Sequence, residues 1–318
     1  MKKIIAVIGA GNIGTRHLQA ILKCQEPCDV FAVEPSEVAI AKAQKILQEQ
    51  YGRVTFCSKV TQLPKNLEVV IVAVSSKIRR KIVEELLIHS NVKYLILEKV
   101  LFPQVEDYIA VKQMLEKTNT KAWVNCVRRS WPYTKRLQEL FSNSEHISMY
   151  VSGNMWGIGC NTIHYIDWLS AITQSDLIPV FDISEIDDEI IASKRTGYVE
   201  FTGKLFVKLG THNLQLTSEH GVFDGFHITI EDDSISCTLR EIGDKGTNII
   251  RNYITGENII EEYECPYQSN LTNRIIFSLL TEGKCALVGY EQSMRQHIPM
   301  IKAFLEKMGK ENGYCNIT

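Results

Sequence analysis

The feature that most constrains the fold of this chain is a glycine-rich turn at residues 9–14, with the sequence GAGNIG. It follows a continuously apolar run at residues 4–8, typical of a strand buried on both faces, and it opens a helical pattern. In such a unit the first glycine permits the tight turn, the second lets the backbone approach a pyrophosphate, and the third allows close helix–strand packing. The sequence therefore predicts a dinucleotide-binding unit whose cofactor contacts include Gly9, Gly11, Asn12, Ile13 and Gly14.

An acidic residue, Glu34, stands twenty positions after Gly14 and directly after the second predicted strand. A carboxylate there can accept hydrogen bonds from the adenosine ribose and repels the 2′-phosphate of NADP, so it favours NAD as the cofactor. An ordinary solvated loop glutamate is the alternative interpretation. Methyltransferases that use S-adenosylmethionine also carry a glycine-rich turn and a second-strand acidic residue, and at this point they remain a competing class.

The first part of the chain alternates short β-branched runs with helical patterns. Strands are predicted at residues 3–8, 29–33, 54–57, 69–74, 94–97 and 122–124, and helices at 13–24, 37–50, 78–89 and 105–117. This alternation predicts an α/β fold with a doubly wound parallel sheet of the Rossmann type.

After about residue 125 the pattern changes to runs of approximate period two. Strands are predicted at residues 147–152, 197–206, 213–217, 226–231 and 236–241, and helices near 131, at 162–171 and at 290–308. This pattern predicts a large, mostly antiparallel open sheet with a few helices. We therefore expect a Rossmann domain at residues 1–125 and an α/β substrate and oligomerisation domain at 126–318, with the last helix packing back on the first domain.

The composition excludes several classes of protein. The formal net charge is −2 and basic residues are scattered among acidic ones, so no nucleic-acid partner is expected. No apolar run is long enough to span a membrane. The nine cysteines are irregularly spaced, and the N-terminus lacks the architecture of a signal peptide, so a cytoplasmic protein with reduced thiols is expected. The short spacing of Cys24 and Cys28 has no accompanying ligands, and no metal site is expected.

Two further places carry candidate chemistry. Glu98 and Lys99 end the fifth predicted strand, at the sheet edge where open parallel sheets bind ligands, and a lysine there can stabilise a developing alkoxide. His164 follows Asn161, a predicted helix N-cap, and an imidazole is suited to exchange a proton with an alcohol. The alternatives are an exposed salt-bridged pair at residues 98–99 and a structural histidine.

These landmarks, in this order, resemble the Gfo/Idh/MocA oxidoreductase family. The resemblance rests on the turn at 9–14 followed by TRHL, on Glu98-Lys99, on the segment HYID at 164–167, on residues 125–133 and on the terminal stretch 285–293. It covers essentially the whole chain. It implies an NAD(P)-dependent oxidoreductase that acts on a sugar, nucleotide sugar or cyclitol, and a homodimer or homotetramer formed through the open sheet.

The resemblance also implies roles for particular residues. Lys99 and His164 match the catalytic lysine and histidine of the family. Ser75 and Glu98 are expected near the cofactor, and Arg129, Cys160 and Asn161 near the substrate.

Two departures from the family pattern stand out. Val100 replaces the proline that usually follows the lysine, so the peptide bond after Lys99 is expected to be trans, because cis bonds are costly before any other residue. Cys160 stands where the family has a carboxylate, four residues before His164, so proton transfer is expected to rely on His164 alone. These departures motivate an alternative, a nucleotide-binding sensor or regulatory protein with little catalysis. The methyltransferase alternative gives no role to Lys99 or His164.

Overall fold

The computed structural model describes residues 2–221 and 225–318. The chain divides into two compact units: a first unit of Met1–Val127 with Tyr267–Ser293, and a second unit of Arg128–Pro266 with Met294–Thr318. The continuous second domain expected from the sequence therefore differs from the structure, in which 267–293 returns to the first unit. The reason is the helix Gln268–Glu282, whose apolar residues Leu271, Ile275 and Leu279 are buried there. Of the last helix, only the residues up to Ser293 group with the first unit.

The first unit contains a seven-stranded sheet in the order β17-β6-β5-β4-β1-β2-β3. Six of its strands are parallel, and the order from β3 to β6 is that of a doubly wound dinucleotide-binding sheet, as the sequence predicted. The seventh, β17, pairs antiparallel with β6. The bounds are β1 Lys3–Ile8, β2 Cys28–Val33, β3 Val54–Cys57, β4 Asn66–Val72, β5 Asn91–Leu97, β6 Lys121–Val124 and β17 Val288–Gly289.

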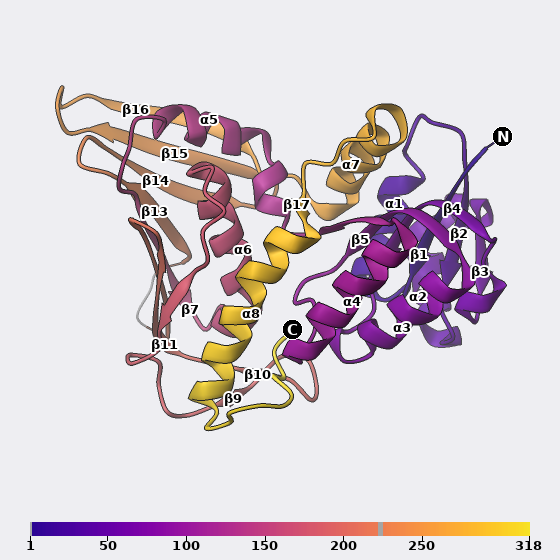
Figure 1. Ribbon diagram of the computed structural model, residues 1–318. Coiled ribbons are helices and arrows are strands. Elements are labelled where there is room, and N and C mark those ends of the chain that lie inside the picture. The colour runs from indigo at the N-terminus through magenta and orange to yellow at the C-terminus, as the bar shows by residue number, and fades with distance from the viewer. Residues whose placement is uncertain (1, 222–224) are drawn as a thin grey trace. The chain divides into compact units, whose positions relative to one another are not determined.

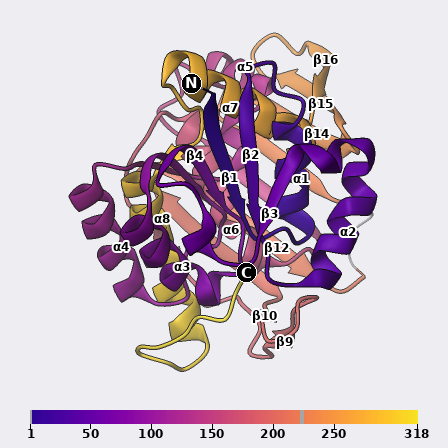
Figure 2. The ribbon, with the colours of Figure 1, turned by 90° about the vertical axis from the view of Figure 1, so that its right-hand side faces the viewer.

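Helices cover both faces of this sheet, which is why its central strands are apolar without interruption. Residues Val69, Val70, Ile71 and Val72 of β4 are fully buried. Figure 2 shows α1 and α2 on one side of the sheet and α3 and α4 on the other, and α7 packs against α1. The bounds are α1 Asn12–Ile21, α2 Glu37–Leu47, α3 Ser76–His89, α4 Val105–Thr118 and α7 Gln268–Glu282, with short 3-10 helices η1 Gln48–Arg53 and η2 Val60–Gln62.

The second unit contains an eight-stranded sheet in the order β16-β15-β14-β13-β7-β12-β11-β8, visible in Figure 1. All neighbouring strands are antiparallel except β7 and β12, which confirms the mostly antiparallel sheet expected from the sequence. The bounds are β7 Ser148–Asn154, β8 Val180–Asp182, β11 Gly203–Leu209, β12 His212–Glu219, β13 His227–Glu231, β14 Ile235–Ile242, β15 Lys245–Asn252 and β16 Asn258–Glu264. A separate two-stranded sheet pairs β9 Ile191–Ala192 with β10 Val199–Glu200.

One face of the larger sheet is covered by helices. Helix α5 contacts β16, and α6 contacts β11, β12 and β10 as well as α5. Their bounds are α5 Pro132–Leu140 and α6 Ile158–Ile172; the unit also contains η3 Val127–Ser130 and most of α8 Tyr290–Lys307. Within the described ranges 2–221 and 225–318, no helix combines the length and the apolarity needed to cross a membrane.

Candidate functional site

The glycine turn has the geometry that its sequence predicts. Gly9 has a φ of +92°, and a Cβ built on it would lie 3.0 Å from Val74. A Cβ on Gly14 would lie 1.8 Å from the carbonyl oxygen of Gly9, so helix α1 approaches the turn too closely for any other residue. Gly11 is different, because a Cβ there would meet nothing within 4 Å. Gly9 and Gly14 are thus required by the fold itself, whereas Gly11 borders open space.

The open space adjoins the N-terminus of helix α1. Gly11 is the N-cap, and Thr15 closes the turn by donating its N–H to the Gly11 carbonyl at 2.9 Å and its hydroxyl to the Ala10 carbonyl at 2.9 Å. The first turn of α1, all of it within the described residues, carries no acidic side chain. Free N–H groups and the positive end of the helix dipole therefore point to the place where a pyrophosphate is held in such folds.

Glu34 lies beside this turn, at the carboxyl end of β2. Its Oε2 accepts the N–H of Ala10 at 2.9 Å, and its Oε1 accepts the N–H of Ser36 at 3.0 Å. The carboxylate is therefore fixed between the glycine turn and the start of α2. Asn12 and Ile13 open α1, and Ser75 follows β4 as the N-cap of α3, so the predicted cofactor residues of the first unit gather along the carboxyl edge of its sheet.

A network of buried polar side chains lies at the carboxyl end of β5. Glu98 is only 7% exposed, and its Oε1 accepts hydrogen bonds from His17 Nε2 at 2.9 Å and from the Asn125 amide at 2.5 Å. His17 comes from α1, and its Nδ1 bonds with the Thr272 hydroxyl of α7 at 2.8 Å. Asn125 also donates to Gln268 of α7 at 3.0 Å.

Ionisation of Glu98 follows from these partners. Burial alone would raise the pKa of this carboxyl group. The hydrogen bonds and charge of His17, the hydrogen bond of Asn125 and the positive charge of Arg79 outweigh burial and hold the pKa of Glu98 below its ordinary value. The buried Glu98 carboxylate therefore holds the position of the residue that follows it, Lys99. The predicted contact of Glu98 with the cofactor stays a prediction.

Replacing Glu98 by glutamine is expected to lower the stability by about 1–3 kcal/mol near neutral pH, because a charge-assisted buried bond is lost. A carboxyl group whose folded-state pKa is lowered stabilises the fold above its ordinary pKa, and this contribution disappears as the pH falls through the folded-state pKa. Thermal unfolding measured from about pH 6 to about pH 3 should thus show a shallower acid loss for Glu98→Gln than for the wild type. The exposed Glu49→Gln control should follow the wild type, and equal slopes for Glu98→Gln and wild type would contradict the assignment.

The peptide after Lys99 corrects a prediction. The bond between Lys99 and Val100 is cis, whereas trans was expected in the absence of proline. Arg79 of α3 contacts the turn that contains this bond. The guanidinium of this buried arginine donates to the carbonyls of Val100 and Leu101 and, at 2.7 Å, to that of Val74, so it fixes the turn from outside the segment. Lys99 itself is half-buried at the carboxyl end of β5.

In the second unit, His164 lies on helix α6, which begins earlier than expected. The helix starts at Ile158 with Gly157 as its N-cap, so the prediction that Asn161 caps a helix beginning at Thr162 is wrong. Gly157 has a φ of +85°, a conformation that lets the chain turn directly into the helix. Asn161 lies inside the first turns, and its amide donates to the Trp156 carbonyl at 2.8 Å.

Cys160, Asn161 and His164 are therefore carried by one helix. His164 follows Cys160 by four residues, so the two side chains are on one helix face, and both are half-buried. Lys99 belongs to the first unit and His164 to the second.

Arg129, which is expected near the substrate, and its neighbour Arg128 both form ion pairs within the second unit. Arg128 pairs with Glu241 at 2.6 Å, and its guanidinium lies 4.6 to 4.9 Å from the ring centres of Trp131, Tyr165 and Trp168. Arg129 pairs with the fully buried Asp167 at 2.8 Å. Burial, opposed by Arg129, raises the pKa of Asp167 to about 6. Any substrate contact by Arg129, still a prediction, would therefore be shared with Asp167.

Sequence reasoning missed four polar residues that support the candidate residues: His17, Arg79, Asn125 and Glu200. One signal was available for His17, which falls on the buried face of α1 with Gly14, Leu18 and Ile21. A histidine at a core position of a helix needs polar partners, and these come from β5 and α7. Nothing in the local sequence indicates the partners of the others, because they come from distant segments.

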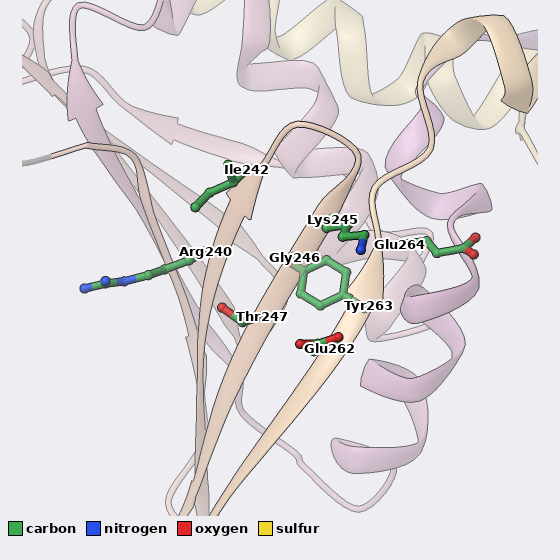
Figure 3. Close-up of a pocket in the computed structure, with 8 residues that line it drawn as sticks. All are labelled: Arg240, Ile242, Lys245, Gly246, Thr247, Glu262, Tyr263 and Glu264. Atoms are coloured by element: carbon green, nitrogen blue, oxygen red, sulfur yellow. The ribbon is translucent and has the colours of Figure 1, made fainter.

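A pocket elsewhere in the second unit offers little chemistry. It lies at the ends of β14, β15 and β16 and is lined by Arg240, Ile242, Lys245, Gly246, Thr247, Glu262, Tyr263 and Glu264. Figure 3 shows Arg240 extending to one side and Lys245 and Glu264 lying on the other. Among the residues that the structure describes, no group of three or more histidine, cysteine or acidic side chains is placed to hold a metal ion.

Comparisons with known proteins extend these observations. Residues 3–126 match an oxidoreductase family with an NAD-binding Rossmann fold, GFO_IDH_MocA. A search of curated proteins finds no match. Among solved structures, the UDP-N-acetylglucosamine 3-dehydrogenase GnnA of Acidithiobacillus ferrooxidans matches with a TM-score of 0.71 at 14% identity over 98% of each chain.

Two other solved structures show the same fold. An oxidoreductase of Agrobacterium radiobacter in complex with NAD+, L-tartaric acid and magnesium has a TM-score of 0.69 at 11% identity over 97% of each chain. The transcriptional regulator Gal80p of Kluyveromyces lactis has a TM-score of 0.70 at 14% identity, over 99% of this chain and 95% of its own. The N-terminal part of the chain, residues 3–126, thus matches the Gfo/Idh/MocA oxidoreductase family, and the chain shares its fold with these solved structures almost from end to end.

Proposed function

We propose that this protein transfers a hydride between a nicotinamide dinucleotide and a secondary hydroxyl or ketone of a sugar, nucleotide sugar or cyclitol. The observation that carries the proposal is the glycine turn, in which Gly11 faces open space beside an uncapped helix N-terminus. The family match adds an NAD-binding Rossmann fold. The dehydrogenase of similar fold from A. ferrooxidans, named for a UDP-linked amino sugar, supports a nucleotide sugar as the first substrate class to test.

The proposed chemistry assigns one role to each of two residues. Bound nicotinamide supplies or accepts the hydride. Lys99 orients the substrate oxygen and stabilises the negative charge that develops on it. His164 takes the hydroxyl proton during oxidation and returns it during reduction. Arg129, Cys160 and Asn161 are proposed to contact the remainder of the substrate.

The test is turnover of NAD(H) and NADP(H), followed by the absorbance of the reduced nicotinamide, across a panel of sugars, cyclitols and nucleotide sugars. Oxidation or reduction of at least one panel member supports the proposal. Binding of S-adenosylmethionine without binding of NADH would overturn it and would favour the methyltransferase interpretation.

Glu34 makes NAD the proposed cofactor. Its carboxylate is held beside the glycine turn by the N–H groups of Ala10 and Ser36, where it can receive ribose hydroxyls and repel a 2′-phosphate. Replacing Glu34 by alanine is expected to weaken NADH binding about tenfold and to reduce the difference in affinity between NADH and NADPH. Calorimetric titration with both cofactors measures the ratio. An unchanged ratio would remove Glu34 from cofactor selection.

We also propose that the protein self-associates through the uncovered face of the second sheet. The strand register aligns one row of residues across this face, and three of its apolar members, Tyr150, Ile249 and Ile260, are exposed. The row runs through Ile260, Ile249, Thr238, Thr229, Tyr150, Gln215, Phe206 and Asp182. A cytoplasmic location is proposed because all nine cysteines are free thiols.

A regulatory role with little turnover is the second candidate. The similar fold of the transcriptional regulator Gal80p favours it, as does the thiol of Cys160 at a position where the resemblance implies a carboxylate. The two candidates differ in one experiment. Tight NADH binding without turnover on the whole panel would favour the regulator, whereas turnover supports the enzyme.

A further inference from the structure

A buried carboxylate stands beside Cys160. Glu200, on β10, is only 7% exposed, and its carboxylate accepts the N–H of Gly159 at 2.7 Å and the N–H of Cys160 at 3.1 Å. These are N–H groups of the first turn of α6, which have no acceptor within the helix. Glu200 thus places a negative charge on the end of the helix where the dipole stabilises it.

Two glycines shape the space that the carboxylate occupies. A Cβ on Gly157 would lie 3.0 Å from Glu200 Oε1 and 3.0 Å from Cys160 Sγ, and a Cβ on Gly159 would lie 2.9 Å from Glu200 Oε2. Larger residues at either position would displace the carboxylate. The start of α6 is therefore built to receive a carboxylate from a distant strand.

The strand that carries Glu200 is held in place on both sides. Val199 donates its N–H to the Asn316 carbonyl at 2.8 Å, so the C-terminal segment pairs with β10. Phe201, next to Glu200, stacks on Phe304 of α8 with ring centres 4.7 Å apart. Cys315 and Ile317 are fully buried. The strand that carries Glu200 is thus held beside α6 by its contacts with the C-terminal segment and with α8.

We propose that Glu200 is a positioning residue for His164 and stands in for the carboxylate that position 160 lacks. It fixes the first turn of α6, one turn before the histidine, and places its carboxylate at the N-terminal end of the helix that carries His164. The inference rests on the proposed catalytic role of His164, but its test does not depend on turnover.

Two arginines that contact side chains of α6 are each paired with an acidic residue. Arg128 faces Glu241 and Tyr165, and Arg129 faces Asp167 of α6 itself. Each of these arginines is thus opposed by an acidic partner of its own. Glu200 differs from these pairs, because its carboxylate is held by backbone N–H groups of the first turn of α6.

The decisive experiment is an NMR titration of histidine-labelled protein, with the His164 signal assigned by its loss in His164→Asn. In Glu200→Gln the titration midpoint of His164 is expected about one pH unit below that of the wild type, because a nearby negative charge is lost. The control Glu189→Gln, at an exposed glutamate of the same unit, should leave the midpoint unchanged. An unchanged midpoint in a folded Glu200→Gln protein overturns the proposal, whether or not the protein turns over any substrate.

Restoring a carboxylate at position 160 gives a second, independent reading. In the Glu200→Gln background, Cys160→Asp should return the His164 midpoint toward the wild-type value and, if the protein is an enzyme, recover the lost part of kcat. In the wild-type background, Cys160→Asp places two carboxylates on one helix turn and should lower the Tm. This single variant keeps Glu200 in place, so it remains informative even if Glu200→Gln fails to fold. An unchanged Tm and an unchanged His164 midpoint in Cys160→Asp would contradict an ionised carboxylate beside Cys160 that acts on His164.

Discussion

Replacing Gly14 by alanine is expected to destabilise the protein by about 3 kcal/mol and to abolish nucleotide binding. The added Cβ would lie 1.8 Å from the carbonyl oxygen of Gly9 and 2.9 Å from its carbonyl carbon. Both are backbone atoms of the turn itself, so the steric clash can be relieved only if α1 moves away from β1. Thermal unfolding should show a Tm lower by roughly 6–12 °C in a domain of this size.

Gly11 provides the matched control for this prediction. Its φ is −66°, and a Cβ there would meet nothing within 4 Å, so Gly11→Ala should change the stability by less than about 0.5 kcal/mol. The methyl group would project into the space beside the N-terminus of α1, so NADH binding should still weaken by at least about tenfold. Equal stability of Gly14→Ala and Gly11→Ala would contradict the close approach of helix and turn.

Replacing Lys99 or His164 by alanine is expected to lower kcat by roughly a hundredfold or more while NADH binding persists. Lys99→Ala removes the positive charge that stabilises the developing alkoxide, and His164→Ala removes the group that exchanges the proton. Initial rates with the substrate found in the panel, together with NADH titrations, separate the two effects. Lys42→Ala, an exposed lysine on α2, is the control and should keep the wild-type rate.

The outcome that contradicts these roles is specific for each residue. Near-normal turnover in Lys99→Ala would leave the Glu98–His17 network as a purely structural feature. Near-normal turnover in His164→Ala would move the proton transfer to another group. A parallel loss of NADH binding in either variant would assign that residue to the cofactor rather than to the substrate.

The parallel sheet of the first unit could be predicted because its strands are apolar on both faces. The runs at 4–8 and 69–74 are buried along almost their whole length in β1 and β4, so pattern and burial agree. The glycine turn was equally clear, since Gly9 and Gly14 answer local steric requirements. Helix α7 was missed, because its place on α1 depends on a segment about 250 residues away in the chain.

The far part of the second sheet was missed for a different reason. In β15 the buried side of the strand is formed by Gly246, Asn248 and Ile250, and the exposed side includes Ile249. Apolar alternation therefore fails there, although the strand itself alternates in burial. Gly246 is required because the ring of Tyr263 would lie 2.2 Å from a Cβ at that position. Such packing across strands leaves no trace in a single strand's sequence.

The candidate site residues also divide into those that local sequence patterns predict and those that they do not. Gly9, Gly14 and Glu34 lie within one βαβ unit, and local reasoning placed them along the carboxyl edge of the sheet. The predictions of a trans bond after Lys99 and of Asn161 as the cap of α6 were wrong. The residues that contact these two places, Arg79 and Glu200, come from distant segments that the local patterns did not connect. Polar groups that hold a functional residue from elsewhere in the fold become visible only in three dimensions.

The most direct test of the central claim is a titration of the purified protein with NADH, followed by the fluorescence of the reduced nicotinamide, in the wild type and in Gly11→Ala. The wild type is expected to bind NADH saturably, and Gly11→Ala is expected to bind at least about tenfold more weakly while keeping the wild-type Tm. Failure of the wild type to bind either NADH or NADPH would contradict a nicotinamide dinucleotide site at the glycine turn.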